Sequence, residues 1–271
     1  MIKPEFKDEQ LLEMLQSTDT DTQQDKFIMS QLESDTSART KRNKPRPFLN
    51  LKLHRRAYFT FTITAIDLIV FIVQLVVNQG VTPGWWLNVS IESLIQLGAK
   101  YTPFILQGQV WRLFTALFLH SGFVHLVLNL FSQIWLGMQT ERFLGWWRLA
   151  IIYFLSGIGG NMASAVFLPE TLQVGASSAI FGLFGIFAVD LAVNWCVHTH
   201  RRLKVVQISI STVLSLLVGI APHIDNFAHI GGLLFGVLAS LVCVPRQCAV
   251  AAHWERAARH KTRVRALVGV S

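Results

Sequence analysis

The sequence has residues of the types that acyl transfer needs at two distant places. Ser177 follows the turn-forming Gly175, and His229 follows the polar pair Asp225-Asn226. A serine hydroxyl is a weak nucleophile until a base removes its proton, and an imidazole does this near neutral pH. The sequence therefore makes Ser177 a candidate nucleophile and His229 its candidate base.

His125 and Asn129 are candidate hydrogen-bond donors for the same chemistry. They are four residues apart, so in a helix they lie on one face. Attack on an amide places negative charge on its oxygen, which requires donors that are already in position. The Asn129 amide, the His125 ring N–H and a backbone N–H near Ser177 are the candidates. If Ser177 begins a helix, unpaired N–H groups and the positive end of the helix dipole also point at this charge.

A zinc site made of His120, His125 and His229 is an alternative interpretation. It has less support, because the five-residue spacing of His120 and His125 is not that of the HExxH metalloprotease helix and no carboxylate lies nearby in sequence. A structural role also stays open for each residue taken singly. A serine in a membrane helix often bonds its own backbone, and a histidine near the end of a span is often interfacial.

The composition indicates that membrane helices position these residues. The 271 residues are 52% hydrophobic and 15% charged, with a mean hydropathy of +0.43, whereas soluble domains carry about 25% charged residues. A membrane-crossing helix needs about 20 mostly apolar residues. The sequence predicts an all-α polytopic bundle with spans over residues 57–77, 114–137, 147–167, 177–196, 204–221 and 227–244. Ser177, His229 and the His125/Asn129 pair then lie at similar depth on one side.

Basic residues predict the orientation of the bundle. The connections after the first, third and fifth predicted spans contain only Lys100 and Arg112 as basic residues, whereas the other connections and the tail are rich in arginine and lysine. By the positive-inside rule both termini are cytoplasmic. The first connection, 78–113, then lies outside or in a lumen. It is long, apolar and aromatic, so we predict that it forms short helices at the membrane surface.

The three predicted regions of the chain are a terminal arm (1–56), a membrane domain (57–244) and a basic cytoplasmic tail (245–271). The arm is acidic over residues 1–40 and basic over 41–56, and we predict that it is cytoplasmic and largely disordered. It resembles neither a signal peptide nor a mitochondrial presequence, which favours the secretory pathway (Golgi) or the plasma membrane over the mitochondrion. Topology signals and contact with membrane lipids account for the net charge of +8, so no nucleic-acid partner is expected.

Five residues fall outside these patterns. Cys196, Cys243 and Cys248 lack zinc-ligand or redox-motif spacing, so we predict packed cysteines and no disulfide framework. Palmitoylation of Cys243 or Cys248 is the alternative. Asp67 and Asp190 lie within predicted spans, so we expect both to face the bundle interior and to be hydrogen-bonded. A regulatory or proton-relay role is the alternative for the two aspartates.

Taken together, these motifs resemble the rhomboid family of intramembrane serine proteases, over roughly residues 57–244. The motifs occur in the order and spacing of that family. They are Trp111-Arg112 in the first loop, the HxxxxHxxxN pattern of His120, His125 and Asn129, the acid-arginine pair Glu141-Arg142, the GxSx motif Gly175-Ala176-Ser177-Ser178, and the histidine helix Ala228-His229-Ile230-Gly231-Gly232 with Gly236 beyond.

The resemblance implies six helices around a water-accessible cavity that opens to the outer side, and a Ser177–His229 dyad without an acidic third member. His125, Asn129 and the Ser177 backbone N–H would form the oxyanion hole. The resemblance assigns supporting roles to His120, Gly175, Phe181, Trp111, Arg112, Gly232 and Gly236. It requires no metal or other cofactor. The implied partners are single-span or other membrane proteins, cut near the outer face where their helices unwind easily.

Two positions depart from the family pattern. Ser178 stands where the family usually has glycine, so added bulk where helices meet predicts lower activity or altered substrate choice. Phe181 stands where a tyrosine often stacks on the catalytic histidine, and phenylalanine keeps the stacking face. The small residues of Ser178/Gly182 and Gly232/Gly236 favour close approach of the two helices that carry Ser177 and His229.

Three functions are compatible with this sequence to different degrees. The first is an active intramembrane serine protease. The second is a catalytically weak or inactive rhomboid-like protein that binds transmembrane helices for trafficking or degradation. Retention of both Ser177 and His229 favours the first. A small-molecule transporter is third, because such proteins usually show inverted repeats and comparison of the two halves of the sequence finds none.

Overall fold

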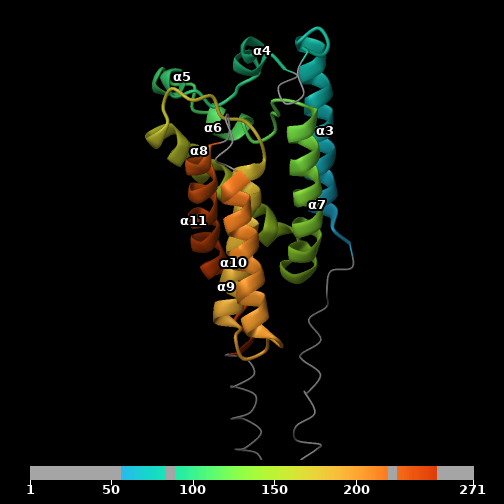
Figure 1. Ribbon diagram of the computed structural model, residues 1–271, viewed down its shortest axis with the longest axis vertical. Helices are drawn as coiled ribbons and strands as arrows, with labels where there is room; N and C mark the ends of the chain where they lie inside the picture. The colour runs from blue at the N-terminus through green and yellow to red at the C-terminus, as the bar shows by residue number, and fades with distance from the viewer. Residues whose placement is uncertain (1–55, 84–88, 219–224, 249–271) are drawn as a thin grey trace, which may run out of the picture. The chain divides into compact units, whose positions relative to one another are not determined.

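The computed structural model describes residues 56–83, 89–218 and 225–248, which belong to one compact unit (Figure 1). The described residues form helices and no named strand. The helices are α3 (Tyr58–Val77), α4 (Ile91–Gln96), α5 (Thr102–Leu106), α6 (Arg112–Thr115), α7 (Phe123–Leu144), α8 (Trp146–Phe167), α9 (Ser177–Val193), α10 (Arg201–Val218) and α11 (Asn226–Cys243). The predictions for the arm and for most of the tail lie outside the described residues.

The long helices have the composition of membrane spans to different degrees. Among the described residues, α3, α8 and α11 are long and apolar enough to cross a membrane, and α9 is a shorter apolar helix. α7 and α10 are long enough but carry more polar or charged side chains. The chain is thus an all-α polytopic membrane protein, as its composition predicts.

The second predicted span has the wrong boundaries. Instead of one helix over 114–137, α6 ends at Thr115 and α7 runs from Phe123 to Leu144. Extended backbone at Gly122 precedes α7, and Gly145, in the left-handed region at φ 85°, follows it. The apolar residues 116–119 precede the polar stretch His120-Ser121-Gly122, so the predicted span begins before this break. The other five predicted spans differ from the helices by three residues or fewer at each end.

α8, α9 and α11 form the closely packed centre of the fold. α9 and α11 approach so closely that a Cβ atom at Gly185 would lie 2.7 Å from the backbone nitrogen of Val237. A Cβ atom at Gly236 would overlap the backbone of Gly182. The predicted close approach of these two helices is therefore confirmed, and glycine is required for it.

α3 is joined to α7 and α8 by buried polar groups. The Glu141 carboxylate, near the end of α7, accepts hydrogen bonds from the backbone nitrogens of Phe59 and Thr60 (2.8 Å each) in the first turn of α3. Deeper in the bundle, Gln133 donates to the fully buried Asp67 carboxylate (2.8 Å) and accepts from the hydroxyl of Tyr153. The prediction that Asp67 is interior and hydrogen-bonded is confirmed.

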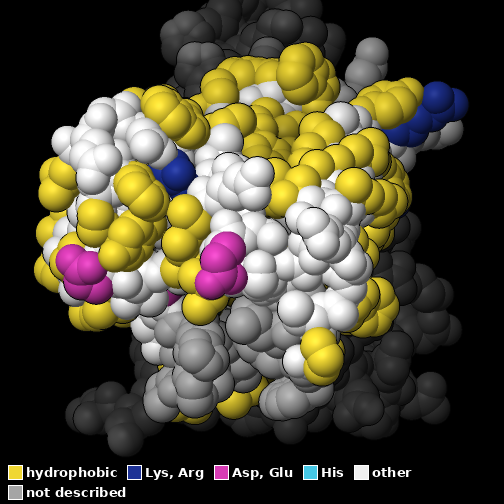
Figure 2. Space-filling model, turned by 90° about the horizontal axis from the view of Figure 1, so that it is seen from above, with side chains coloured by type: hydrophobic (Ala, Val, Ile, Leu, Met, Phe, Trp, Pro, Cys, Tyr) yellow, Lys and Arg dark blue, Asp and Glu magenta, His cyan; other side chains and the backbone are white. Residues whose placement is uncertain are grey.

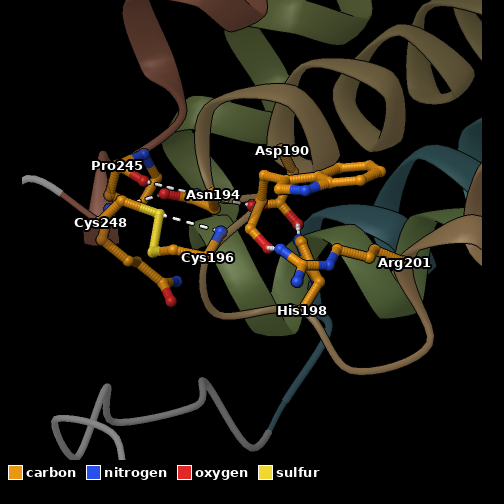
Figure 3. Close-up of a disulfide and its surroundings, with 9 residues drawn as sticks. Asp190, Asn194, Cys196, His198, Arg201, Pro245 and Cys248 are labelled. Atoms are coloured by element: carbon orange, nitrogen blue, oxygen red, sulfur yellow. Dashed lines mark hydrogen bonds and ion pairs between the residues drawn. A yellow bond between two sulfur atoms is a disulfide. The ribbon is translucent and has the colours of Figure 1, made fainter. Parts of the chain in front are cut away.

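The predicted absence of disulfides is wrong, because Cys196 and Cys248 are bonded to each other (Figure 3). Cys196 lies after the end of α9 and Cys248 after the end of α11, so the packing of the two helices brings together cysteines that are 52 positions apart. Cys243 is free. Asp190 is hydrogen-bonded to Asn194 (2.8 Å) in the same region, but its side chain is partly exposed at the end of α9 and pairs with His198.

The predicted short helices of the first connection are confirmed as α4, α5 and α6. They lie at the end of the bundle where α9 and α11 begin, which we call the site end. Lys100 pairs with Gln173 there in an antiparallel bridge, and the backbone nitrogen of Gly175 donates to the oxygen of Ala116 (2.9 Å). Figure 2 shows hydrophobic side chains over much of this end, and Leu106 and Trp111 are among the exposed ones.

Candidate functional site

Ser177 and His229 meet at the site end. Ser177 is the first residue of α9, and His229 lies in the first turn of α11. The Oγ atom of Ser177 is 2.9 Å from the Nε2 atom of His229. With the imidazole proton on Nδ1, the serine hydroxyl donates to Nε2, which is the geometry that general-base activation requires. Because both helices begin at the same end, each side chain extends from a first turn toward the other.

The ring of His229 is held by packing. Phe181, one turn beyond Ser177, stacks on it with the ring centroids 4.4 Å apart and an interplanar angle of 12°. His229 is 6% exposed, and its Nδ1 atom is buried without a hydrogen-bond partner among the described residues. No carboxylate therefore orients this imidazole by a direct hydrogen bond within the described structure. The flat contact with Phe181 fixes the ring plane instead.

His125 and Asn129 lie beside the turn that precedes Ser177. Gly175 has φ 117°, and a Cβ atom there would be 2.8 Å from Cε1 of His125 and 3.9 Å from Nδ2 of Asn129. Nδ1 of His125 contacts the hydroxyl of Ser121 (3.0 Å), while its Nε2 lies on the side of Gly175. Both candidate donors are thus close to the turn that leads into the nucleophile.

The Asn129 side-chain amide already makes one hydrogen bond in the structure. Its Nδ2 donates to the backbone oxygen of His125 (2.8 Å), one turn earlier in α7. A side-chain amide carries two N–H donors, so an oxyanion can be bound by the second one while the first keeps the side chain in place.

His120 precedes α7 and stabilises the loop by its backbone. Gln74 of α3 accepts from the His120 nitrogen (3.0 Å) and donates to its oxygen (2.8 Å). The ring of His120 lies edge-on to that of His125, with the centroids 5.3 Å apart. The described residues contain no group of three His, Cys, Asp or Glu side chains that could hold a metal ion. The geometry therefore does not support the alternative zinc site.

Trp111 and Arg112 have different environments. The buried Arg112 guanidinium donates from Nη1 to the oxygens of Ile95 (2.8 Å) and Ala99 (3.0 Å), so it connects α6 to the last turn of α4 and to the segment that follows. The Trp111 side chain is 55% exposed, and its backbone oxygen accepts from the nitrogen and the hydroxyl of Thr115. Arg112 is thus an anchor of the loop through its side chain, whereas Trp111 contributes through its backbone.

Ser178 faces α8. Its hydroxyl donates to the Gly157 oxygen (3.4 Å), and a Cβ atom at Gly160 would lie 2.6 Å from the Ser178 Cβ. Gly232 of α11 packs against the Ser178 backbone. Glycines on the neighbouring helices therefore provide the room for the extra side chain.

Sequence analysis did not predict the contacts of three buried polar residues near the site, which are Lys100, Ser164 and Asp225. The Asp225 carboxylate caps α11 by accepting from the backbone nitrogen of Ala228 (3.0 Å), and it also accepts from the Ser164 hydroxyl. An aspartate immediately before an apolar helix is a recognised N-cap signal, so that part was readable. The partners Ser164 and Lys100 are far away in sequence and no local pattern indicates them.

Comparison with known proteins identifies related sequences. The family described as the Rhomboid domain matches residues 107–246. The chain is 40% identical over 152 residues to "RHOMBOID-like protein 6, mitochondrial" of Arabidopsis thaliana, covering 56% of this chain and 50% of that protein. It is 36% identical over 183 residues to "Rhomboid-like protease 3" of Toxoplasma gondii, covering 67% and 66%. The chain spans about half the length of several curated relatives that it matches.

Proposed function

Because this chain belongs to the rhomboid family, we propose that it is an intramembrane serine endopeptidase with Ser177 as nucleophile and His229 as general base. The observation that carries the proposal is the 2.9 Å separation of the Ser177 Oγ and His229 Nε2 atoms. Two of the relatives are themselves named rhomboid-like proteases.

The proposed reaction follows from the positions of these groups. Ser177 Oγ attacks the carbonyl carbon of a substrate peptide bond while its proton moves to Nε2 of His229. The oxyanion accepts hydrogen bonds from His125, Asn129 and the backbone N–H of Ser177. His229 then gives the proton to the leaving amine as the carbon–nitrogen bond breaks. Water, activated by the same imidazole, hydrolyses the acyl-enzyme and releases Ser177.

Substrates in this proposal are transmembrane segments of single-span or other membrane proteins, cut near the outer face. The distribution of basic residues supports cleavage on the outer side of the membrane. The first turns of α9 and α11 lie at the site end, whereas Arg201, Arg202 and Lys204 lie in the first turn of α10, after the opposite end of α9. By the positive-inside rule the site end faces outward and both termini are cytoplasmic.

The test is cleavage of a single-span reporter whose outer segment contains helix-breaking residues. Wild type, Ser177→Ala and His229→Ala are compared at matched expression. We expect cleavage by the wild type and losses of several orders of magnitude in both variants, because removing either member of a nucleophile–base pair disables the unit. Substantial cleavage by purified Ser177→Ala protein would reject the nucleophile assignment.

A second measurement covers the case in which no variant cleaves the reporter. Labelling of the wild type but not Ser177→Ala by a fluorophosphonate probe would keep the enzyme proposal and show that the reporter is the wrong substrate. Absence of labelling would support the alternative, a rhomboid-like protein that binds transmembrane helices without cleaving them.

A further inference from the structure

The start of α11 is fixed by a buried carboxylate. Asp225 is 2% exposed and lies four residues before His229. One carboxylate oxygen accepts from the backbone nitrogen of Ala228 (3.0 Å), and the other accepts from the hydroxyl of Ser164, a fully buried residue near the end of α8. The backbone oxygen of Asp225 accepts from the His229 nitrogen (3.3 Å). The side chain that begins α11 therefore ties the turn that carries His229 to α8.

A buried ammonium group fixes the chain before Ser177 in a parallel way. Lys100 has no exposed surface, and its Nζ donates to the backbone oxygens of Leu168 (2.8 Å) and Thr171 (2.9 Å), just beyond α8. Its backbone exchanges two hydrogen bonds of 3.0 Å with Gln173. Lys100 therefore holds the segment between the end of α8 and Gly175.

These two charged groups also attract each other. Burial lowers the pKa of Lys100 to about 8, and the Asp225 carboxylate acts in the opposite direction by favouring the ammonium form. Buried charges are costly unless they are paired and hydrogen-bonded. Here the Lys100 ammonium donates two hydrogen bonds and the Asp225 carboxylate accepts two. Each charge is also stabilised by the opposite charge of the other group. Both are anchored at the same end of α8, since Ser164 and Leu168 are one helical turn apart.

We infer that Asp225 and Lys100 are positioning residues, which use the end of α8 as a common support to hold His229 and Ser177 in register. The inference rests on the proposed function. Neither side chain contacts the Ser177 Oγ or the His229 ring by a hydrogen bond that the structure shows. Asp225 positions His229 through the α11 cap, and Lys100 positions Ser177 through the segment that leads to Gly175. A shift of about 1 Å between nucleophile and base can cost on the order of 10²-fold in rate.

The test compares reporter cleavage by the full-length wild-type protein and by Asp225→Ala, Asp225→Asn and Lys100→Met. Asp225→Ala removes both hydrogen bonds, and we expect kcat to fall on the order of 10²-fold with KM changed by less than about threefold. Asparagine is as good an N-cap as aspartate, and its amide can donate to Ser164, so Asp225→Asn should recover most of the rate. Lys100→Met should lower kcat by about tenfold, again with KM nearly unchanged.

Asp190→Asn is the matched control. This aspartate also makes a side-chain hydrogen bond, with Asn194, but it lies at the opposite end of α9. The Asp190→Asn variant should leave kcat unchanged. The thermal midpoint of each variant is measured in the same detergent, so that rates are compared well below unfolding.

The outcomes separate the two proposals. Ser177-dependent cleavage by the wild type, with Asp225→Ala and Lys100→Met at the wild-type rate, would overturn the positioning roles and leave the protease proposal intact. A loss of kcat that simply follows the thermal midpoint across all variants, Asp190→Asn included, would also overturn them. A wild type that neither cleaves nor reacts with the fluorophosphonate probe would remove both proposals.

Discussion

At the scale of single residues, Gly175 has a position near the site that only glycine fits well. Its φ of 117° is a conformation that residues with a Cβ atom rarely adopt, and the space for that atom is taken by the His125 ring. The residue is therefore constrained twice, by its backbone and by its neighbour. Ser178, in contrast, is accommodated by Gly157 and Gly160 of α8, so this departure from the family pattern lies at a contact between helices.

Replacing Gly175 with alanine should reduce cleavage on the order of 10²-fold, because the new methyl group would lie 2.8 Å from His125 Cε1 and displace the ring. The measurement is reporter cleavage by purified protein. Gly108→Ala is the control, since Gly108 has a similar φ of 95° and nothing within 4 Å of the added atom. That variant should show only a backbone strain of roughly 1–2 kcal/mol. Equal cleavage losses in both variants would contradict a specific contact with His125.

At the scale of elements, α9 and α11 run in parallel with a constant offset. Ser177 meets His229 at one end, Cys196 is bonded to Cys248 at the other, and each pair is separated by 52 positions. Gly185 and Val237, with the same offset, are in close contact between them. The helices that bring the candidate dyad together are thus aligned over their whole length.

Removing the disulfide should lower stability without changing cleavage. Cys196→Ser deletes a crosslink between segments 52 positions apart, and losses of about 2–4 kcal/mol are typical for a disulfide. The bond lies at the opposite end of both helices from Ser177 and His229, so kcat should stay near the wild-type value. The measurement is thermal unfolding with and without dithiothreitol. Wild type should be destabilised by the reductant, whereas Cys196→Ser should not respond.

Cys243→Ser is the control for this experiment, because Cys243 is the free cysteine of the described part of the chain. It should respond to the reductant as the wild type does. A reductant effect that persists in Cys196→Ser would show that the disulfide is not the group responsible.

At the scale of the whole molecule, the buried Lys100 ammonium links global stability to pH. Its pKa is lowered from 10.5 to about 8, mainly because burial disfavours the charged form. Between these values the folded protein binds fewer protons than the unfolded chain, so stability rises with pH across this range. Below pH 8 Lys100 is protonated in both the folded and the unfolded protein, so burial of its charge destabilises the folded protein by the largest amount.

The prediction is that the thermal midpoint of the wild type rises relative to Lys100→Met as pH increases from 7 to 10. Each unit of pKa difference corresponds to about 1.4 kcal/mol. The free energy of unfolding of the wild type should therefore rise by roughly 1–3 kcal/mol relative to that of Lys100→Met over this pH range. The difference between the two proteins cancels the titration of other groups. A constant or decreasing difference would contradict a buried, charged Lys100 in the folded state.

The sequence by itself determined the helices and the reactive residue types. Five of the six predicted spans agree with helices to within three residues, because the length of an apolar run is a local property that hydropathy reports directly. The second span was predicted with the wrong bounds, because the helix starts after Gly122 and ends before Gly145, where the backbone conformation sets its boundaries. Ser177, His229, His125 and Asn129 were recognisable by type and by motif.

The tertiary structure alone decided which of these residues meet. The 2.9 Å contact of Ser177 with His229, the bond between Cys196 and Cys248, and the support of Asp225 and Lys100 by α8 all join positions far apart in the chain. Such pairs depend on the rotation and offset with which helices pack, and here glycine contacts between α8, α9 and α11 set both. Packing of this kind is a property of several elements at once, so no single stretch of sequence contains it.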